Sequence, residues 1–266
     1  ENYGPDLRFD FVTVRGFTPK QYIDGLAAPV STSIYSVGVD LYAFESFDVL
    51  KGPASALYGS APPGGLYNQT SRRPENEFSG EIQAKYGSDD YKQIAGTVTG
   101  PLSESVSYSL TGLYRDREAE RDLVSADRTL IAPAITWDIT PDTKLTGLAY
   151  YQLDHVDGDT NGYLPVYGTL LPNPLGEVDP ATNVGDPNNR FEREQWAYGY
   201  EFSHKLTDTV SFISNSKLSS YDEETPTSIY GGGGLVDDDF DGVPDDYRTV
   251  QQYNFSYAEH VDSFAS

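Results

Sequence analysis

The stretch that decides the fold reads Ala197-Tyr198-Gly199-Tyr200-Glu201-Phe202-Ser203-His204-Lys205-Leu206. Its aromatic and apolar side chains, with one histidine, fall on the even positions, and small or polar residues fall on the odd ones. Because successive side chains of a β-strand point to opposite faces, this period of two predicts a strand with one apolar and one polar face. Such a strand over about ten residues is typical of a membrane barrel, although a soluble β-sandwich alternates as well.

The same alternation continues along the chain from Glu81 onward. We expect about eight strands, near residues 81–88, 91–100, 105–115, 128–138, 143–155, 194–206, 209–220 and 249–260. Short turns such as Thr140-Pro141-Asp142-Thr143 alternate along the chain with longer polar connections at 116–126, 156–192 and 221–247. Short turns at one end and long loops at the other indicate an up-and-down barrel rather than a sandwich.

The composition excludes several classes of protein. The 266 residues contain 18 Lys and Arg against 41 Asp and Glu, a net charge of −23, which argues against nucleic acid as a partner. Without cysteine there is no disulfide framework and no thiolate nucleophile or metal ligand. No run reaches the roughly 18 apolar residues of a membrane helix. Since the chain opens on Glu1 and contains no Met, we expect a processed product or a fragment.

Residues 1–74 have a different character, with glycines and prolines that impose several turns. Three motifs follow one another there. They are Val14-Arg15-Gly16-Phe17, then Tyr22-Ile23-Asp24-Gly25-Leu26, then the long run from Phe47-Asp48-Val49-Leu50-Lys51-Gly52-Pro53 through Leu57-Tyr58-Gly59 and Pro63-Gly64-Gly65-Leu66-Tyr67-Asn68 to Ser71-Arg72-Arg73-Pro74. No Gly-Lys-Ser/Thr follows the glycines, so a phosphate-binding loop is a poor explanation.

By order and spacing, these motifs resemble the plug of TonB-dependent outer-membrane siderophore receptors, and the later part of the chain is most similar to the ferrichrome or ferric-hydroxamate type. The resemblance implies a mainly β fold, a transmembrane antiparallel β-barrel with an N-terminal α/β plug domain. It assigns 1–74 to a plug incomplete at its N-terminus, 75–80 to a linker and 81–266 to the N-terminal part of the barrel. A plugged barrel of this class needs 22 strands, of which about eight are expected here.

The resemblance also implies a binding site between the plug apex and the long loops. Arg15 lies in the family's Arg-Gly-Phe motif, Tyr163 lies in a stretch (162–169) resembling the third extracellular loop, and Tyr230 lies in a stretch (228–231) resembling the start of the fourth. A guanidinium can donate several hydrogen bonds to hydroxamate or carbonyl oxygens, and aromatic rings supply rigid apolar walls. Arg15 could equally be an internal salt-bridge partner.

One acidic loop suggests a metal. Asp237, Asp239, Asp241 and Gly242 match the start of a D-x-D-x-D-G calcium loop, and Asp245 follows closely. Arg248 stands where the bidentate Glu of such a loop is expected. A calcium site of weak, structural type and a solvated acidic loop tip therefore both stay open. We expect the surrounding loop, 221–248, to gather negative charge outside the cell, from nine carboxylates against one arginine: Asp222, Glu223, Glu224, Asp237, Asp238, Asp239, Asp241, Asp245 and Asp246 against Arg248.

The sequence thus predicts a receptor in the bacterial outer membrane that binds and imports a ferric siderophore, with the TonB complex and outer-membrane lipid or lipopolysaccharide as partners. No nucleophile motif or acid/base pair is visible, so we expect no enzyme and no covalent cofactor. One alternative keeps the transporter and changes the cargo to cobalamin, haem or an oligosaccharide. Others are a secreted calcium-stabilised β-sandwich that binds or hydrolyses glycans, and a structural or adhesive outer-membrane protein without transport.

Overall fold

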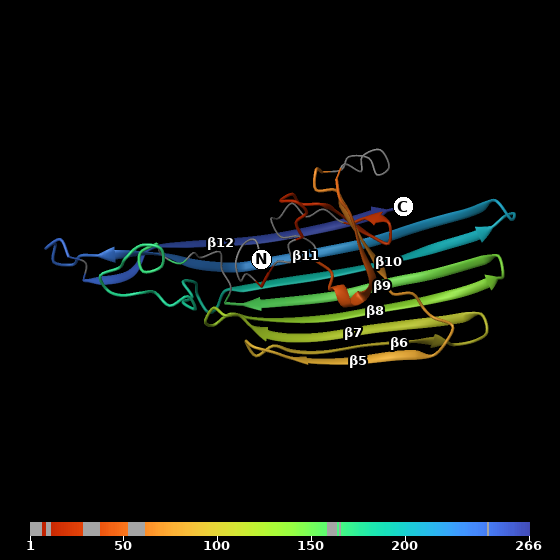
Figure 1. Ribbon diagram of the computed structural model, residues 1–266, viewed down its shortest axis with the longest axis horizontal. Helices are drawn as coiled ribbons and strands as arrows, with labels where there is room; N and C mark the ends of the chain where they lie inside the picture. Colours follow the sequence, from red (N-terminus) through yellow and green to blue (C-terminus); the bar gives the residue numbers. More distant parts are fainter. Residues whose placement is uncertain are drawn as a thin grey trace.

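The computed structural model describes residues 7–8, 12–28, 38–52, 62–158, 164, 166–243 and 245–266, without the side chains of 227–234, 246–253 and 255. Its dominant element, here called the large sheet, has the order β12-β11-β10-β9-β8-β7-β6-β5, so every strand pairs with its neighbours in sequence. The strands are β5 (Ser79–Tyr86), β6 (Lys92–Pro101), β7 (Val106–Glu118), β8 (Ser125–Thr140), β9 (Thr143–Asp157), β10 (Arg190–Lys205), β11 (Ser211–Val236) and β12 (Asp246–Ala265). All eight predicted strands are present in the predicted up-and-down order (Figure 1).

The predicted loop at 221–247 is largely a hairpin instead. β11 and β12 stay paired out to Val236 and Asp246, so the expected loop at 221–247 is wrong over most of its length. The segment around Tyr230, expected to begin a loop, lies within β11, where Tyr230 pairs with Tyr253. Polar composition suggested a loop here. A hairpin that projects beyond its sheet can, however, carry polar side chains on both faces while its two strands remain hydrogen-bonded to each other.

The small sheet is formed by β1 (Lys20–Ile23), β2 (Leu26–Ala27), β3 (Phe44–Leu50) and β4 (Leu66–Ser71), in the order β2-β1-β4-β3. The predicted turn at Asp24-Gly25 joins β1 to β2 with positive φ values of 55° and 77°. One 3-10 turn, η1 (Leu41–Ala43), is the only helical element in the described ranges, and the motif residues 53–61 lie outside them. No helix among the described residues is long and apolar enough to cross a membrane.

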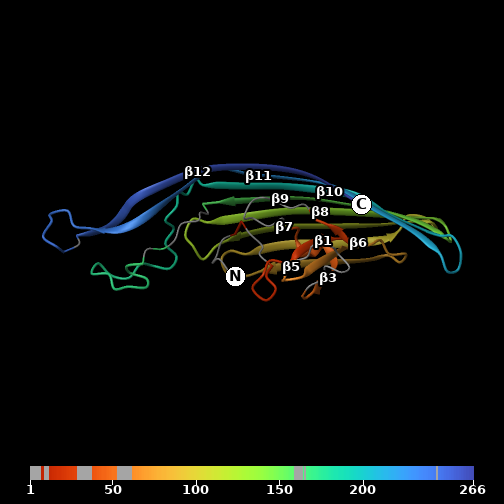
Figure 2. The same ribbon diagram turned by 90° about the horizontal axis from the view of Figure 1, so that it is seen from above.

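The small sheet lies against the concave face of the large sheet (Figure 2). One apolar core joins the two. Residues of the N-terminal unit pack with inward residues of the large sheet: Ile23, Ala28, Val39, Ala43 and Phe44 against Ala95, Leu113, Leu130, Tyr150 and Ala197. Among the described residues, the main apolar cluster of the N-terminal unit is therefore completed by the wall of the large sheet.

The convex face of the large sheet carries exposed apolar side chains. Ile82 is 86% exposed, Leu110 46% and Trp137 48%, whereas the polar Thr111 and Gln152 on the concave face are 1% and 0% exposed. A soluble sheet would place its apolar side chains toward the core. Apolar residues outside and polar residues inside are the arrangement of a membrane barrel wall.

Candidate functional site

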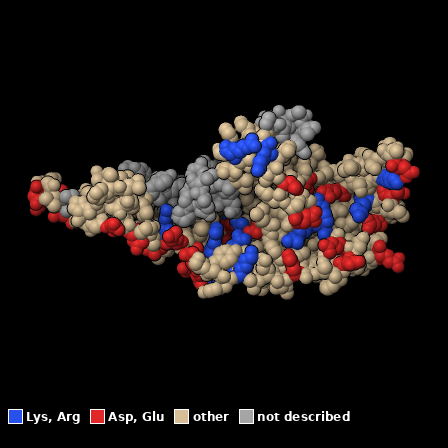
Figure 3. Space-filling model, in the orientation of Figure 1, with Lys and Arg blue, Asp and Glu red and all other residues tan. Residues whose placement is uncertain are grey.

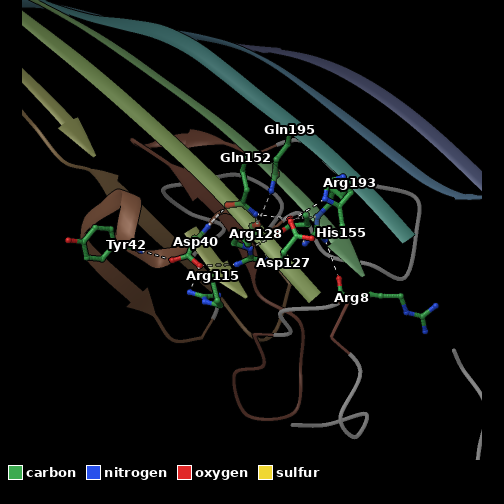
Figure 4. Close-up of polar contacts among 12 residues, drawn as sticks. Arg8, Asp40, Tyr42, Arg115, Asp127, Arg128, Gln152, His155, Arg193 and Gln195 are labelled. Carbon is green, nitrogen blue, oxygen red and sulfur yellow. Dashed lines mark hydrogen bonds and ion pairs between the residues drawn. The ribbon is translucent and has the colours of Figure 1, made fainter. Parts of the chain in front are cut away.

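A buried aspartate of the N-terminal unit binds two arginines of the large sheet (Figure 4). Asp40, just before η1, accepts hydrogen bonds at Oδ2 from Arg115 Nη2 on β7 at 2.7 Å and from Arg128 Nη1 on β8 at 3.0 Å. Its Oδ1 accepts from the Tyr42 N–H at 3.0 Å and so caps η1. Burial alone would raise the pKa of Asp40, but the charges of Arg115 and Arg128 outweigh burial and hold the pKa below its ordinary value.

Two glutamines extend this contact along the wall. Gln152 on β9 and Gln195 on β10 both donate from Nε2 to the carbonyl oxygen of Gly38, at 3.0 and 2.9 Å. Gln152 also accepts the Asp40 N–H at Oε1, at 2.8 Å. We call the contacts of Gly38 and Asp40 with Arg115, Arg128, Gln152 and Gln195 the upper anchor.

The arginines of the upper anchor belong to a charged row across neighbouring strands. In register, Arg115 faces Arg128, Arg128 faces Asp154, and Asp154 faces Arg193. Asp154, which is 4% exposed, binds Arg128 and lies 3.0 Å from Arg193 Nη2. Arg193 Nη1 donates to the backbone oxygen of Arg8 at 3.3 Å, which brings the start of the described chain to the same row. Asp154 lies between Arg128 and Arg193 in this row, and Asp40 supplies the carboxylate that Arg115 and Arg128, two like charges side by side, both need.

A second buried aspartate, Asp24 at the β1–β2 turn, forms what we call the lower anchor. It lies 2.6 Å from Lys217 Nζ on β11 and 3.1 Å from Arg73 Nη2, and it accepts the N–H and hydroxyl of Ser71, both at 2.8 Å. Arg73 also pairs with Glu201 on β10 at 2.5 Å. Burial would raise the pKa of Asp24, but Lys217 and Arg73 outweigh it and lower the pKa.

The pKa of Arg73 is consistent with its ion pairs to Asp24 and Glu201. Burial would lower the pKa of its guanidinium, but the Asp24 and Glu201 carboxylates raise it above its ordinary value. Asn215 adds a neutral bond from Nδ2 to the backbone oxygen of Asp24 at 2.7 Å. The N-terminal unit is thus attached to the wall at two buried charged points in addition to the shared apolar core, and Arg72 adds a more exposed ion pair with Glu81 on β5 at 3.4 Å.

Arg15, the predicted ligand residue, lies at the tip of a tight turn. Val14 and Phe17 exchange two backbone hydrogen bonds of 2.9 and 3.1 Å around Arg15 and Gly16, whose φ values are 53° and 82°. The Arg15 residue is exposed, and within the described part of the chain its guanidinium has no hydrogen bond or ion pair. The alternative of an internal salt bridge therefore finds no partner among the described residues.

The side chains of the other two predicted ligand residues are not among those that the structure describes. Tyr163 lies outside the described residues, as do Gly162 and Pro165 of the motif stretch 162–169. Tyr230 is placed by its backbone within β11, and its side chain is not described. Beyond the unplaced residues, the connection between β9 and β10 turns sharply, with Gly168 N–H bonded to the Leu171 oxygen at 2.8 Å.

The acidic tip of the β11–β12 hairpin gathers three carboxylates. Ligand oxygens of Asp237, Asp239 and Asp245 all lie within 4.8 Å of one another. Asp241, whose carboxylate accepts the Val243 N–H at 2.8 Å, is not part of this group. The tip projects far beyond the rest of the sheet, and acidic side chains mark its end (Figure 3).

The expected extracellular charge of residues 221–248 is partly misplaced. Glu223 faces the concave side of β11, where it is 0% exposed and accepts the Tyr221 hydroxyl. Because the segment is strand rather than loop, Glu223 points inward and meets a partner there, while its neighbours Asp222 and Glu224 lie on the other face.

The residues of the two anchors were not singled out from the sequence. The period of two does place Arg115, Arg128, Asp154, Arg193 and Lys217 on the concave face with the polar set. A charged side chain in the polar series, within a strand long enough to cross a membrane, was the available signal. The pattern could not identify the carboxylates that pair with these cations, because Asp24 and Asp40 lie in turns, where the side chains do not alternate between two faces.

Together these features define a class: an up-and-down membrane-type sheet whose concave wall holds an N-terminal plug through buried ionic contacts. Residues 2–66 match the model of the TonB-dependent Receptor Plug Domain. The chain is 34% identical over 239 residues to the ferrichrome outer membrane transporter/phage receptor of Escherichia coli K12, covering 86% of this chain and 32% of that protein. It is 32% identical to the ferrioxamine B receptor of Salmonella typhimurium, covering 87% and 34%.

Solved structures support the same fold. The ferric-catecholate import receptor Fiu of E. coli K12 superposes with a TM-score of 0.77 at 20% identity, covering 98% of this chain and 37% of that one. The ferripyoverdine receptor of Pseudomonas aeruginosa superposes with a TM-score of 0.68 at 23% identity, covering 85% and 30%. The predicted resemblance to TonB-dependent siderophore receptors of the ferrichrome type is confirmed, as are the predicted fold class and the outer-membrane location. The chain spans about a third of the length of the curated relatives that it matches.

Proposed function

We propose that this chain is the plug and adjoining barrel wall of a receptor that binds a ferric siderophore of the hydroxamate type and imports it with energy from TonB. Support comes from the relatives, which are named as a ferrichrome transporter and ferrioxamine receptors. They are transport proteins rather than enzymes by name. In this proposal residues 1–74 act as the plug, 75–80 as the linker and 81–266 as barrel wall.

The observation that carries the ligand role is the state of Arg15. An arginine at the tip of a turn with two positive φ values, exposed and without a partner in the described residues, is available to a ligand. Its planar guanidinium suits the carbonyl and hydroxamate oxygens around a bound ferric ion, because it donates several hydrogen bonds in one plane. Tyr163 and Tyr230 are proposed as the aromatic walls of the same site.

Binding of ferrichrome to the full receptor tests this role. Because a hydrogen bond from a charged group contributes about 1.5–3 kcal/mol, Arg15→Ala should weaken binding by roughly 10-fold to 150-fold, and Arg15→Lys should recover part of the loss. Lys205→Ala, which removes an exposed cation at a short turn of the large sheet, is the matched control and should bind as wild type does. Unchanged affinity in Arg15→Ala would remove the assignment.

Transport is tested separately, by uptake of iron-55 ferrichrome into cells with and without a functional TonB complex. Uptake that persists without TonB would contradict the proposed energy coupling. Uptake of cobalamin or haem with no uptake of ferrichrome would favour the alternative cargo.

We further propose that Asp237, Asp239 and Asp245 hold a calcium ion of weak affinity, with Asp241 orienting the loop backbone. The convergence of three carboxylates on one point supports this role, because Ca²⁺ prefers several oxygen ligands in a flexible loop. Calorimetry on the receptor should show calcium heat at millimolar concentration that disappears in Asp239→Asn. The absence of that heat in the wild type would leave a solvated acidic tip.

A further inference from the structure

The convex face of the large sheet has an apolar groove at the middle of strands β5 to β8. The groove is open to the outside. In register, Ile82 faces Gly96, Gly96 faces Gly112, and Gly112 faces Ile131, so two side chains are missing from one row between two isoleucines. Val98 and Leu110 continue the lining toward the short turns.

One of the two glycines is not required by the chain itself. A Cβ at Gly96 would lie 3.1 Å from the Glu81 oxygen, so close backbone approach explains that glycine. A Cβ at Gly112 would meet only the Leu130 oxygen, at 3.8 Å, which is ordinary contact, and the φ angle of Gly112 is not positive. Glycine in a strand interior costs about 0.5–1 kcal/mol relative to alanine, so the recess is what Gly112 contributes.

The size of the recess suits a hydrocarbon chain. Neighbouring strands lie about 4.8 Å apart, so the paired glycines of β6 and β7 leave a recess about 10 Å wide across the strands, and Val98 and Leu110 bound it toward the short turns. Along the strand, Gly96 lies four residues from Lys92, or about 13 Å, which places the groove well inside the apolar band of the face.

The charges at the two ends of the groove differ. Toward the long loops, Lys92 lies 2.5 Å from Asp90 and faces Asp116 across the strands, so two carboxylates surround one cation. Toward the short turns, the outward side chains of β6 to β8 are uncharged: Val98, Leu110, Tyr108, Pro133, Ile135 and Trp137. A polyanionic head group is therefore disfavoured at the loop end, and a chain entering from the uncharged, aromatic end meets no unpaired charge.

We propose that the groove at Gly96 and Gly112 binds one acyl chain of a zwitterionic phospholipid from the leaflet on the side of the short turns. The phospholipid chain fills the space that two missing side chains leave and covers Ile82, Leu110 and Ile131. This site rests on the membrane location of the sheet and is independent of the siderophore site.

Native mass spectrometry of the full receptor in detergent, supplied with dipalmitoyl phosphatidylethanolamine, tests the site. The wild type should retain one lipid more than Gly112→Leu, which fills the recess, and Gly112→Ala should be intermediate. Ala149→Leu adds bulk to the same convex face outside the groove and should retain lipid as the wild type does. Thermal unfolding of each variant separates lost binding from lost fold.

Equal lipid retention in wild type and Gly112→Leu would overturn the proposal. Preferential retention of lipid A over phosphatidylethanolamine would contradict the assigned leaflet, and a dimer lost in Gly112→Leu would show that a second copy occupies the groove instead. Ferrichrome binding should be the same in Gly112→Leu and wild type. If lipid retention does not differ between them, the proposed transport function is unaffected. If neither protein binds ferrichrome, the lipid measurement can still be interpreted.

Discussion

The lower anchor makes a quantitative prediction about how firmly the plug is held. Asp24 is 7% exposed and meets Lys217 at 2.6 Å and Arg73 at 3.1 Å. In Asp24→Asn, the amide keeps the shape of the side chain but leaves Lys217 with no carboxylate, while Arg73 retains Glu201. Breaking a buried ion pair from one side costs about 3–5 kcal/mol.

The expected effect is at the lower end of that range, because Lys217 keeps a contact of 3.3 Å with the Ile23 oxygen and Arg73 keeps its second carboxylate. A loss of about 3 kcal/mol corresponds to roughly a hundredfold increase in the opening equilibrium of the plug. Hydrogen–deuterium exchange on the full receptor in detergent should show this in peptides of β1, β2 and β4, whereas β8 and β9 keep their protection.

A matched control lies in the same small sheet. Asp48 on β3 is exposed and accepts only the Ser46 hydroxyl at 3.1 Å, so Asp48→Asn should change protection by less than about 1 kcal/mol. The double variant Asp24→Asn, Lys217→Gln should lose less than the sum of the two single losses, because each single change leaves the other charge unpaired. A change of less than threefold in Asp24→Asn, or strict additivity in the double variant, would refute the anchor.

Three further outcomes are expected. Gly65→Ala should destabilise the plug by more than about 2 kcal/mol in thermal unfolding, because the added Cβ would lie 2.0 Å from the Leu50 oxygen and φ is +86°. Gln152→Leu should cost about 1–3 kcal/mol in the same assay, since it leaves the buried Asp40 N–H without its acceptor. Because Asp24 and Asp40 both have lowered pKa values, anchor stability should be complete above the ordinary aspartate pKa of about 3.9 and be lost as the pH falls further; near-UV circular dichroism that changes between pH 7 and pH 5 would contradict this.

The large sheet could be predicted from the sequence because its cause is local. A period of two assigns each side chain to a face, and that assignment holds for Tyr198 on the convex side and Gln195 on the concave side. The end of a strand has no such cause. β11 includes Gly231 to Gly234 and continues to Val236 because its partner β12 extends equally far. The residues of β11 alone do not indicate how far β12 extends.

The candidate site divides along the same line. Arg15 could be named because it lies in the Val14-Arg15-Gly16-Phe17 motif that carries the family resemblance, and the structure then places it at the tip of a tight turn. The anchors could not, because Asp24 and Lys217 are separated by 193 residues and meet only when the plug is inside the wall. The period of two predicts that Lys217 faces inward. Only the three-dimensional arrangement shows that the Asp24 carboxylate compensates the charge of this buried lysine.

The distribution of forces between plug and wall bears on how such a plug could move. A transport step needs an attachment that is stable at rest and yields to a limited pull. The apolar core shared by Ile23, Phe44 and Leu130 resists separation in proportion to its buried area, whereas each ion pair loses most of its attraction once it is hydrated. Since Asp24 lies next to Ile23 in the same turn, a displacement of β1 admits water to the Lys217 pair and loosens the core at one place. The lower anchor is therefore where we expect plug release to begin, and the upper anchor at Asp40, held by two arginines and a glutamine, to yield later.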